Sequence, residues 1–100
     1  MASYREFKVT PSQYEVFRFS LPRRTAVNID MIATKPVNLV VLGREEMQEY
    51  EHGQLASHSF TRVWNGRRSL NEQVDLDEGT WYLIVEGHKA KSVGTIRLSP

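Results

Sequence analysis

The sequence predicts an all-β fold: a two-sheet antiparallel β-sandwich of jelly-roll type, with about eight strands and one short helix. Three observations predict it. Short segments alternate between apolar and polar residues, as half-buried strands do. Turn residues separate these segments at regular spacing, which is typical of sandwiches and barrels. The segment 79–87 is strongly apolar and rich in the aromatic and β-branched residues that favour strands.

Segment 79–87 is expected to be a central strand. Glu78 and Gly79 supply the turn before it, because glycine adopts positive φ without strain. One face carries Trp81, Leu83 and Val85, and the other face is also largely apolar. Both faces should therefore be at least partly covered, and Trp81 is expected in the core.

The other strands are expected, in chain order, at 4–9, 14–21, 25–33, 37–42, 60–64, 67–74 and 93–98. Segment 37–42 is a continuous apolar run, which indicates a strand buried on both faces. Lys35 and Pro36 are expected to separate it from the strand before it. Asn65 and Gly66 form a strong hairpin signal, because both tolerate positive φ. Residues 55–59 are polar and predict a loop.

A short helix is expected at 44–51, where most residues are good helix formers. It would last about two turns and stop near Gly53. Because so short a helix is marginal alone, it should pack on the sheet through Met47 and Tyr50.

Composition limits the possible functions. The length predicts one domain, 1–100. Thirteen Lys and Arg against twelve Asp and Glu leave a net charge of +1, which argues against nucleic acid and anionic membranes as partners. The chain has no cysteine, no apolar run long enough for a membrane span and no apolar signal core at its start. The simplest expectation is a cytoplasmic protein.

No set of residues predicts catalysis, so we expect no enzyme, no cofactor and no metal centre. His52, His58 and His88 are scattered and lack metal-ligand spacing. Segment 57–59, Ser-His-Ser, has no third group to orient the imidazole. Asp75, Asp77 and Glu78 loosely resemble a calcium loop but lack the full ligand set, and whether they bind a cation stays open.

The order of strand entries resembles the pre-peptidase C-terminal domain, a bacterial β-sandwich. The matching segments are Gly79-Thr80-Trp81-Tyr82 and Gly94-Thr95-Ile96-Arg97-Leu98. The chain is also similar to small stand-alone bacterial sandwiches of unknown function. The resemblance implies a jelly-roll-like sandwich with an accessory or binding role. A secreted role is not carried over, because no enzyme and no signal accompany the segment.

Two hypotheses for the function follow. The first is a non-enzymatic interaction module that acts through protein contacts or self-association, with a protein partner or a homo-oligomer. Its contact surface would be edge strands and the hairpin, where Trp64 and Tyr50 could form an aromatic patch with Tyr82. The alternative is a binding domain for carbohydrate or an anionic group, through Trp64, Arg67 and Arg68.

Overall fold

The computed structural model describes residues 3–52 and 61–100. Six strands and one helix follow each other along the chain: β1 (Ser3–Val9), β2 (Tyr14–Leu21), β3 (Thr25–Gly43), α1 (Arg44–Glu51), β4 (Arg62–Leu76), β5 (Gly79–Gly87) and β6 (Ser92–Ser99). The all-β prediction is confirmed. The predicted loop at 55–59, the helix stop near Gly53 and the start of the strand expected at 60–64 lie outside the described residues.

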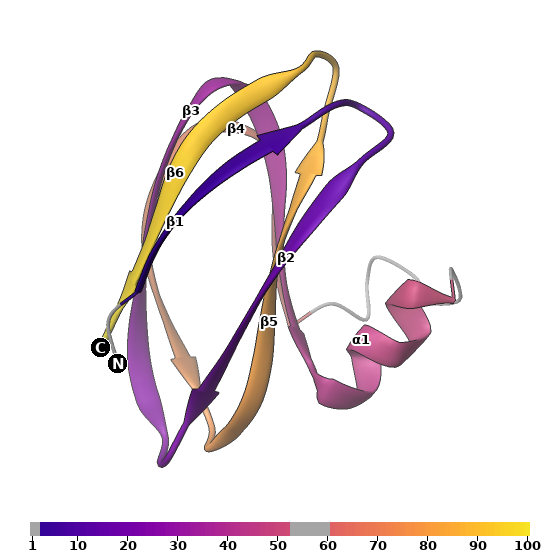
Figure 1. The fold of residues 1–100 in the computed structure, drawn as a ribbon. Helices are drawn as coiled ribbons and strands as arrows, with labels where there is room; N and C mark the ends of the chain where they lie inside the picture. Colours follow the sequence, from indigo (N-terminus) through magenta and orange to yellow (C-terminus); the bar gives the residue numbers. More distant parts are fainter. Residues whose placement is uncertain (1–2, 53–60) are drawn as a thin grey trace.

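The strands form one curled antiparallel sheet in the order β1-β6-β3-β5-β2, with β4 paired to β3. The long strand β3 has two successive neighbours on its other side. Residues 28–33 pair with β6, and residues 37–43 pair with β5. The curl brings the two end strands β1 and β2 into contact, and helix α1 lies outside β5 and β3 (Figure 1).

The predicted number of strands was wrong, because two pairs of expected strands are each continuous. The segments expected at 25–33 and 37–42 both belong to β3. Pro36 does not end the strand, because it lies in a register shift between Ile32 and Val37. Proline is tolerated at such an irregularity. A sandwich of two separate sheets is not confirmed, since β3 and β4 run through both halves of the curl.

The predicted hairpin at Asn65 and Gly66 was also wrong. Both residues lie inside β4, in a second register shift where Val37 pairs with Arg67 but Leu39 pairs with Trp64. Gly66 has a φ of +64°. Gly66 therefore has the positive φ that the sequence predicts, whereas Asn65 does not, and this conformation belongs to a β-bulge instead of a turn.

The core consists of two apolar clusters on opposite faces of β5 and of the second half of β3. The larger cluster fills the inside of the curl and includes Leu39, Leu83 and Val85. The smaller one, outside the sheet, joins Val40, Leu42, Ile84 and Met47 to the partly buried Tyr50 and Tyr82. Segments 79–87 and 37–42 are thus covered on both faces, as predicted. Trp81, however, is only partly buried against the larger cluster.

Helix α1 confirms both its expected range and its expected contacts. Met47 is buried, and Tyr50 packs on the same outer cluster. The helix covers the outer face of β3 and β5, which is apolar because both strands carry apolar residues on both faces. No helix within 3–52 and 61–100 is long and apolar enough to cross a membrane.

The turn between β1 and β2 packs closely on the end of β5. Gln13 N–H donates to the Thr10 carbonyl at 3.0 Å, and Gly87 N–H donates to the Gln13 carbonyl at 3.0 Å. A side chain at position 87 has no room, because a Cβ there would lie 1.7 Å from the Thr10 carbonyl oxygen. Gly87 therefore permits the contact that closes this end of the curl.

Candidate functional site

The aromatic side chains predicted to form a binding patch lie in two different apolar clusters. Trp64 is 9 % exposed and belongs to the cluster inside the curl, with the Arg62 guanidinium 5.1 Å from its ring centroid. Tyr50 and Tyr82 belong to the outer cluster. The expected surface patch of Trp64, Tyr50 and Tyr82 therefore does not form.

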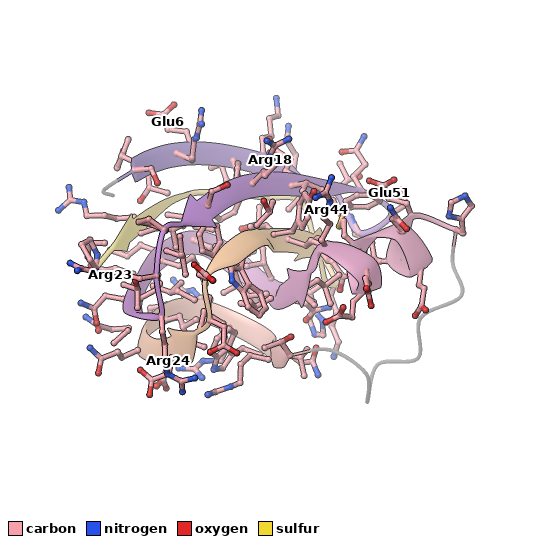
Figure 2. All side chains as sticks on the ribbon, turned by 90° about the horizontal axis from the view of Figure 1, so that it is seen from below. Glu6, Arg18, Arg23, Arg24, Arg44 and Glu51 are labelled. Carbon is pink, nitrogen blue, oxygen red and sulfur yellow. The ribbon has the colours of Figure 1, made fainter. Side chains whose placement is uncertain are left out.

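Arg67 and Arg68 lie far from Arg23 and Arg24, the other pair of consecutive arginines at a predicted turn. Arg67 and Arg68 are exposed residues in the middle of β4. Arg24 lies beside the far end of that strand, because the neighbouring Thr25 pairs with Leu76. Leu76 follows Arg68 by eight positions in the strand, or about 26 Å at the usual rise. In Figure 2, Arg23 and Arg24 lie at the turn between β2 and β3, away from Arg44 at the start of α1.

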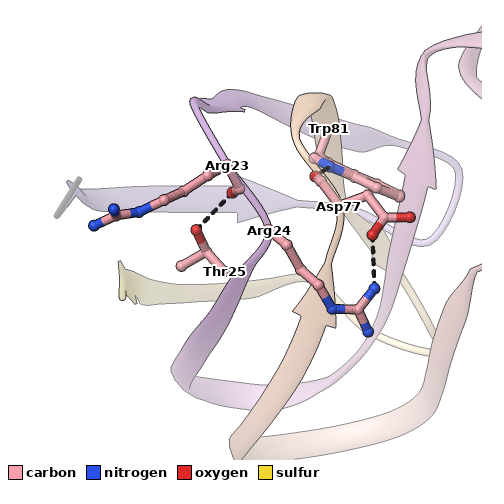
Figure 3. A network of polar contacts seen from close by, with 5 residues as sticks. All are labelled: Arg23, Arg24, Thr25, Asp77 and Trp81. Carbon is pink, nitrogen blue, oxygen red and sulfur yellow. Dashed lines mark hydrogen bonds and ion pairs between the residues drawn. The ribbon is translucent and has the colours of Figure 1, made fainter.

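Asp77, one of the candidate cation ligands, is held in a small surface network (Figure 3). Its carboxylate accepts from Arg24 at 2.6 Å, and its carbonyl accepts from Trp81 Nε1 at 2.9 Å. Both charged side chains are well exposed, so this pair adds little stability. Among the described residues, no three His, Cys, Asp or Glu side chains group as a metal site would need. Segment 57–59 lies outside the described residues.

Among the described residues we consider two concave sites as candidates. The first, which we call the outer groove, has a volume of about 650 Å³ and is lined by β1, β6, β3 and Glu15 of β2. Ile32 is 65 % exposed and Val93 is 41 % exposed in this groove. Glu15 also accepts a hydrogen bond from the Lys8 N–H at 2.6 Å, which ties the two end strands together.

The strand register explains the composition of the outer groove. Thr95 pairs with both Glu6 and Ile32, so these three residues form one row across β1, β6 and β3. Val93 pairs with Lys8 in the neighbouring row. The groove therefore has apolar residues on β3 and β6 and two opposite charges on β1.

The second site, which we call the tyrosine pocket, has a volume of about 250 Å³ and is lined by Tyr14, Tyr50, Glu86, Gly87 and the turn residues 11–13. The two tyrosine rings are 5.3 Å apart between centroids and stand at 86° to each other. The Tyr50 hydroxyl donates to the Glu86 carboxylate at 2.5 Å. Because Tyr14 pairs with Glu86 across β2 and β5, the sheet itself sets their spacing.

Burial raises the pKa of Tyr50 above its ordinary value of 10.0. The hydrogen bond to Glu86 and the negative charge of that carboxylate raise the pKa further, because both favour the protonated phenol. Tyr50 therefore remains a hydrogen-bond donor at neutral pH, and it orients the Glu86 carboxylate.

The comparison with solved structures supports the fold and leaves the function open. No protein-family model and no curated protein matches the sequence. A crystal structure of the pre-peptidase C-terminal domain of a collagenase from Bacillus anthracis superposes with a TM-score of 0.58. It covers 95 % of this chain and 86 % of that chain, at 13 % sequence identity. The chain shares the fold of that domain. The resemblance to pre-peptidase C-terminal domains read from the sequence is thus confirmed for the fold.

Sequence reasoning missed Tyr14 and Glu86. The alternation in each strand placed them on a face, but only the pairing of β2 with β5 places them opposite each other. Ile32 is an apolar residue at a position of segment 25–33 where alternation with Ile29 and Met31 would place a polar one, and it is exposed.

Proposed function

We propose that the chain is a non-enzymatic interaction module that acts through protein contacts, and that a second copy of the chain occupies the outer groove. The observation that carries this proposal is the exposure of Ile32 and Val93 beside each other in a groove of about 650 Å³. Exposed apolar side chains gathered in one concavity are typical of protein contact sites. A cytoplasmic setting is part of the same proposal.

The charges of the groove favour a second copy over an unrelated partner. In a two-fold contact the same surface faces itself, so each residue meets a residue of the same surface on the other copy. Glu6 and Lys8 lie two residues apart on β1, at the same groove. A two-fold arrangement can therefore place each Glu6 against the other copy's Lys8. The net charge of +1 gives two copies little mutual repulsion.

The fold supports a non-enzymatic role only in a general way. The solved structure that shares the fold is a pre-peptidase C-terminal domain of a collagenase, and the likeness at 13 % identity concerns the fold alone. Within the described part of this chain, neither concave site combines a nucleophile with a base and an orienting group.

No observation favours the alternative function, carbohydrate or anion binding through Trp64, Arg67 and Arg68. A carbohydrate site needs exposed aromatic rings, and the Trp64 ring is buried inside the curl. Arg67 and Arg68 are exposed, and anion binding by these two side chains stays a prediction.

Sedimentation velocity over a concentration series tests self-association. The wild-type protein is expected to shift from one chain toward two as its concentration rises. Val93→Lys should abolish the shift, because it places an amine in the apolar part of the groove. Val63→Lys is the matched control, since Val63 is a valine of similar exposure, 39 %, on β4 and outside this groove.

Two results would overturn the proposal. One is a wild-type protein that remains a single chain up to its solubility limit. The other is a dimer that Val93→Lys and Val63→Lys weaken equally, because that dimer would not use the groove. Far-UV circular dichroism of both variants establishes that each is folded.

A further inference from the structure

The tyrosine pocket has the chemical character of a cation site. Tyr14 and Tyr50 both line it, and their rings meet edge to face with their planes at 86°. The faces of aromatic rings carry partial negative charge and attract ammonium and guanidinium groups. Glu86 adds a full negative charge to the same pocket.

The charge of Glu86 has no positive partner among the described residues. The one ion pair within 3–52 and 61–100 joins Arg24 to Asp77, and none of the residues that line the pocket is a Lys, Arg or His. The Tyr50 hydroxyl donates one hydrogen bond to Glu86. A carboxylate offers about four lone-pair sites, so it can accept further donors. A partly buried carboxylate with one donor and no cation is incompletely compensated.

The pocket is also preformed. The turn that makes one wall is held by hydrogen bonds from Gln13 N–H to the Thr10 carbonyl and from Gly87 N–H to the Gln13 carbonyl. The side-chain carbonyl of Gln13 accepts a further bond from the Thr10 N–H at 3.3 Å. Walls fixed in this way reduce the ordering that a ligand would otherwise impose.

We propose that the tyrosine pocket binds a compact organic ammonium group, of the kind found at the end of a lysine side chain or in a methylated amine. The aromatic rings attract the cation and Glu86 neutralises it. A primary ammonium can donate hydrogen bonds to Glu86, whereas a quaternary ammonium uses the rings and the charge alone. This site is separate from the outer groove and does not depend on self-association.

Titration followed by ¹H–¹⁵N NMR tests the proposal. The probes are n-butylammonium, tetramethylammonium and the neutral tert-butyl alcohol, at constant ionic strength. At least one ammonium probe is expected to shift the backbone amides of Gln13, Tyr14 and Gly87 in a saturable way, and the alcohol is not. Stronger binding of n-butylammonium would identify a lysine-like ligand. Stronger binding of tetramethylammonium would identify a methylated amine.

Two variants examine the named groups, and a third is the control. Glu86→Gln keeps the shape and removes the charge, and Tyr14→Leu removes one aromatic ring. Each is expected to weaken ammonium binding by about five- to thirtyfold, the effect of losing one partly desolvated cation contact. Tyr4→Leu alters a tyrosine of comparable exposure, 55 %, that is not part of the pocket, and should leave the affinity unchanged.

The proposal is wrong if neither ammonium probe exceeds the alcohol in its effect on the pocket amides. It is equally wrong if Glu86→Gln binds the ammonium probes as tightly as the wild type. The NMR spectrum of each variant shows directly whether it is folded, so a loss of binding is not confused with a loss of structure.

Discussion

Replacing Gly87 with alanine tests the close packing of the β1–β2 turn on β5. The added Cβ would lie 1.7 Å from the Thr10 carbonyl oxygen, 2.3 Å from the Thr10 carbonyl carbon and 2.7 Å from the Pro11 nitrogen. All three atoms belong to the backbone, so no side-chain rotation relieves the overlap. The turn must move away, and the hydrogen bond from Gly87 N–H to the Gln13 carbonyl is strained or lost.

The cost follows from these two effects. Overpacking at a fixed contact costs about 1–3 kcal/mol, and a lost backbone hydrogen bond costs about 1 kcal/mol more. Gly87→Ala should therefore lower the free energy of unfolding by about 2–4 kcal/mol in a urea titration. It should also disturb the amides of the tyrosine pocket, which the turn lines.

Gly43→Ala is the matched control for this prediction. The three atoms nearest to a Cβ at Gly43 all belong to the carboxylate of Glu46, the closest at 3.1 Å, and that side chain can rotate away. Gly43 is the N-cap of α1, where alanine is less suitable than glycine, so a loss below about 1 kcal/mol is expected. Equal losses for the two variants would refute the reasoning, because they would show that the turn does not approach β5 so closely.

Three further predictions use the same unfolding assay. Trp81→Ala should cost about 2–4 kcal/mol, since Trp81 is partly buried against the inner cluster, and a loss below about 1 kcal/mol would place it outside the core. Gly66→Ala should cost about 1–2 kcal/mol, because its φ of +64° disfavours a side chain, while Gly66→Asn should cost less. The pKa of Tyr50 is higher in the folded than in the unfolded protein, so the protonated phenol stabilises the fold fully below pH 10. Above pH 10 this stabilisation is lost, by at most about 1.4 kcal/mol per pH unit and by less with solvent screening. Tyr50→Phe should remove that part of the alkaline loss, and an unchanged pH slope would contradict the assignment.

The elements that depend on local signals could be predicted from the sequence. Helix α1 was expected at 44–51 and spans Arg44–Glu51, because helix formers and the flanking glycines give local boundaries. The two faces of β5 followed from alternation alone, and Leu83 and Ile84 indeed lie in different clusters. The range of α1 and the two faces of β5 each depend only on residues within one continuous segment, so neither requires knowledge of distant strands.

The continuity of β3 and β4 could not be predicted in the same way. Pro36 and Gly66 are residues that ordinarily end a strand or form a turn. Here each lies at a register shift, where one strand gains residues relative to its neighbour. At the shift near Pro36, β3 also changes its partner from β6 to β5. That change depends on two distant strands, so no local pattern in β3 reveals it.

The same reasoning explains why Trp64 is buried, although its place beside Asn65 and Gly66 predicted exposure. The sequence drew attention to Trp64 because it stands beside Asn65 and Gly66, and a hairpin tip would have exposed it. Inside the continuous strand β4, Trp64 and Leu70 both belong to the cluster inside the curl.

Both concave sites arise from pairing between strands that are not consecutive in the chain. Tyr14 meets Glu86 because β2 pairs with β5, and Ile32 lies in a row with Glu6 because β6 stands between β3 and β1. The alternation of apolar and polar residues shows on which face of the sheet each of these residues lies. Only the strand register shows which residues of the neighbouring strands lie beside it. A site whose residues lie side by side on different strands can therefore be found only once the strand pairing is known. Substitutions at the residues that fix the register should disturb such a site most. Gly87 is such a residue, because it fixes the turn that leads from β1 into β2 and so holds Tyr14 opposite Glu86.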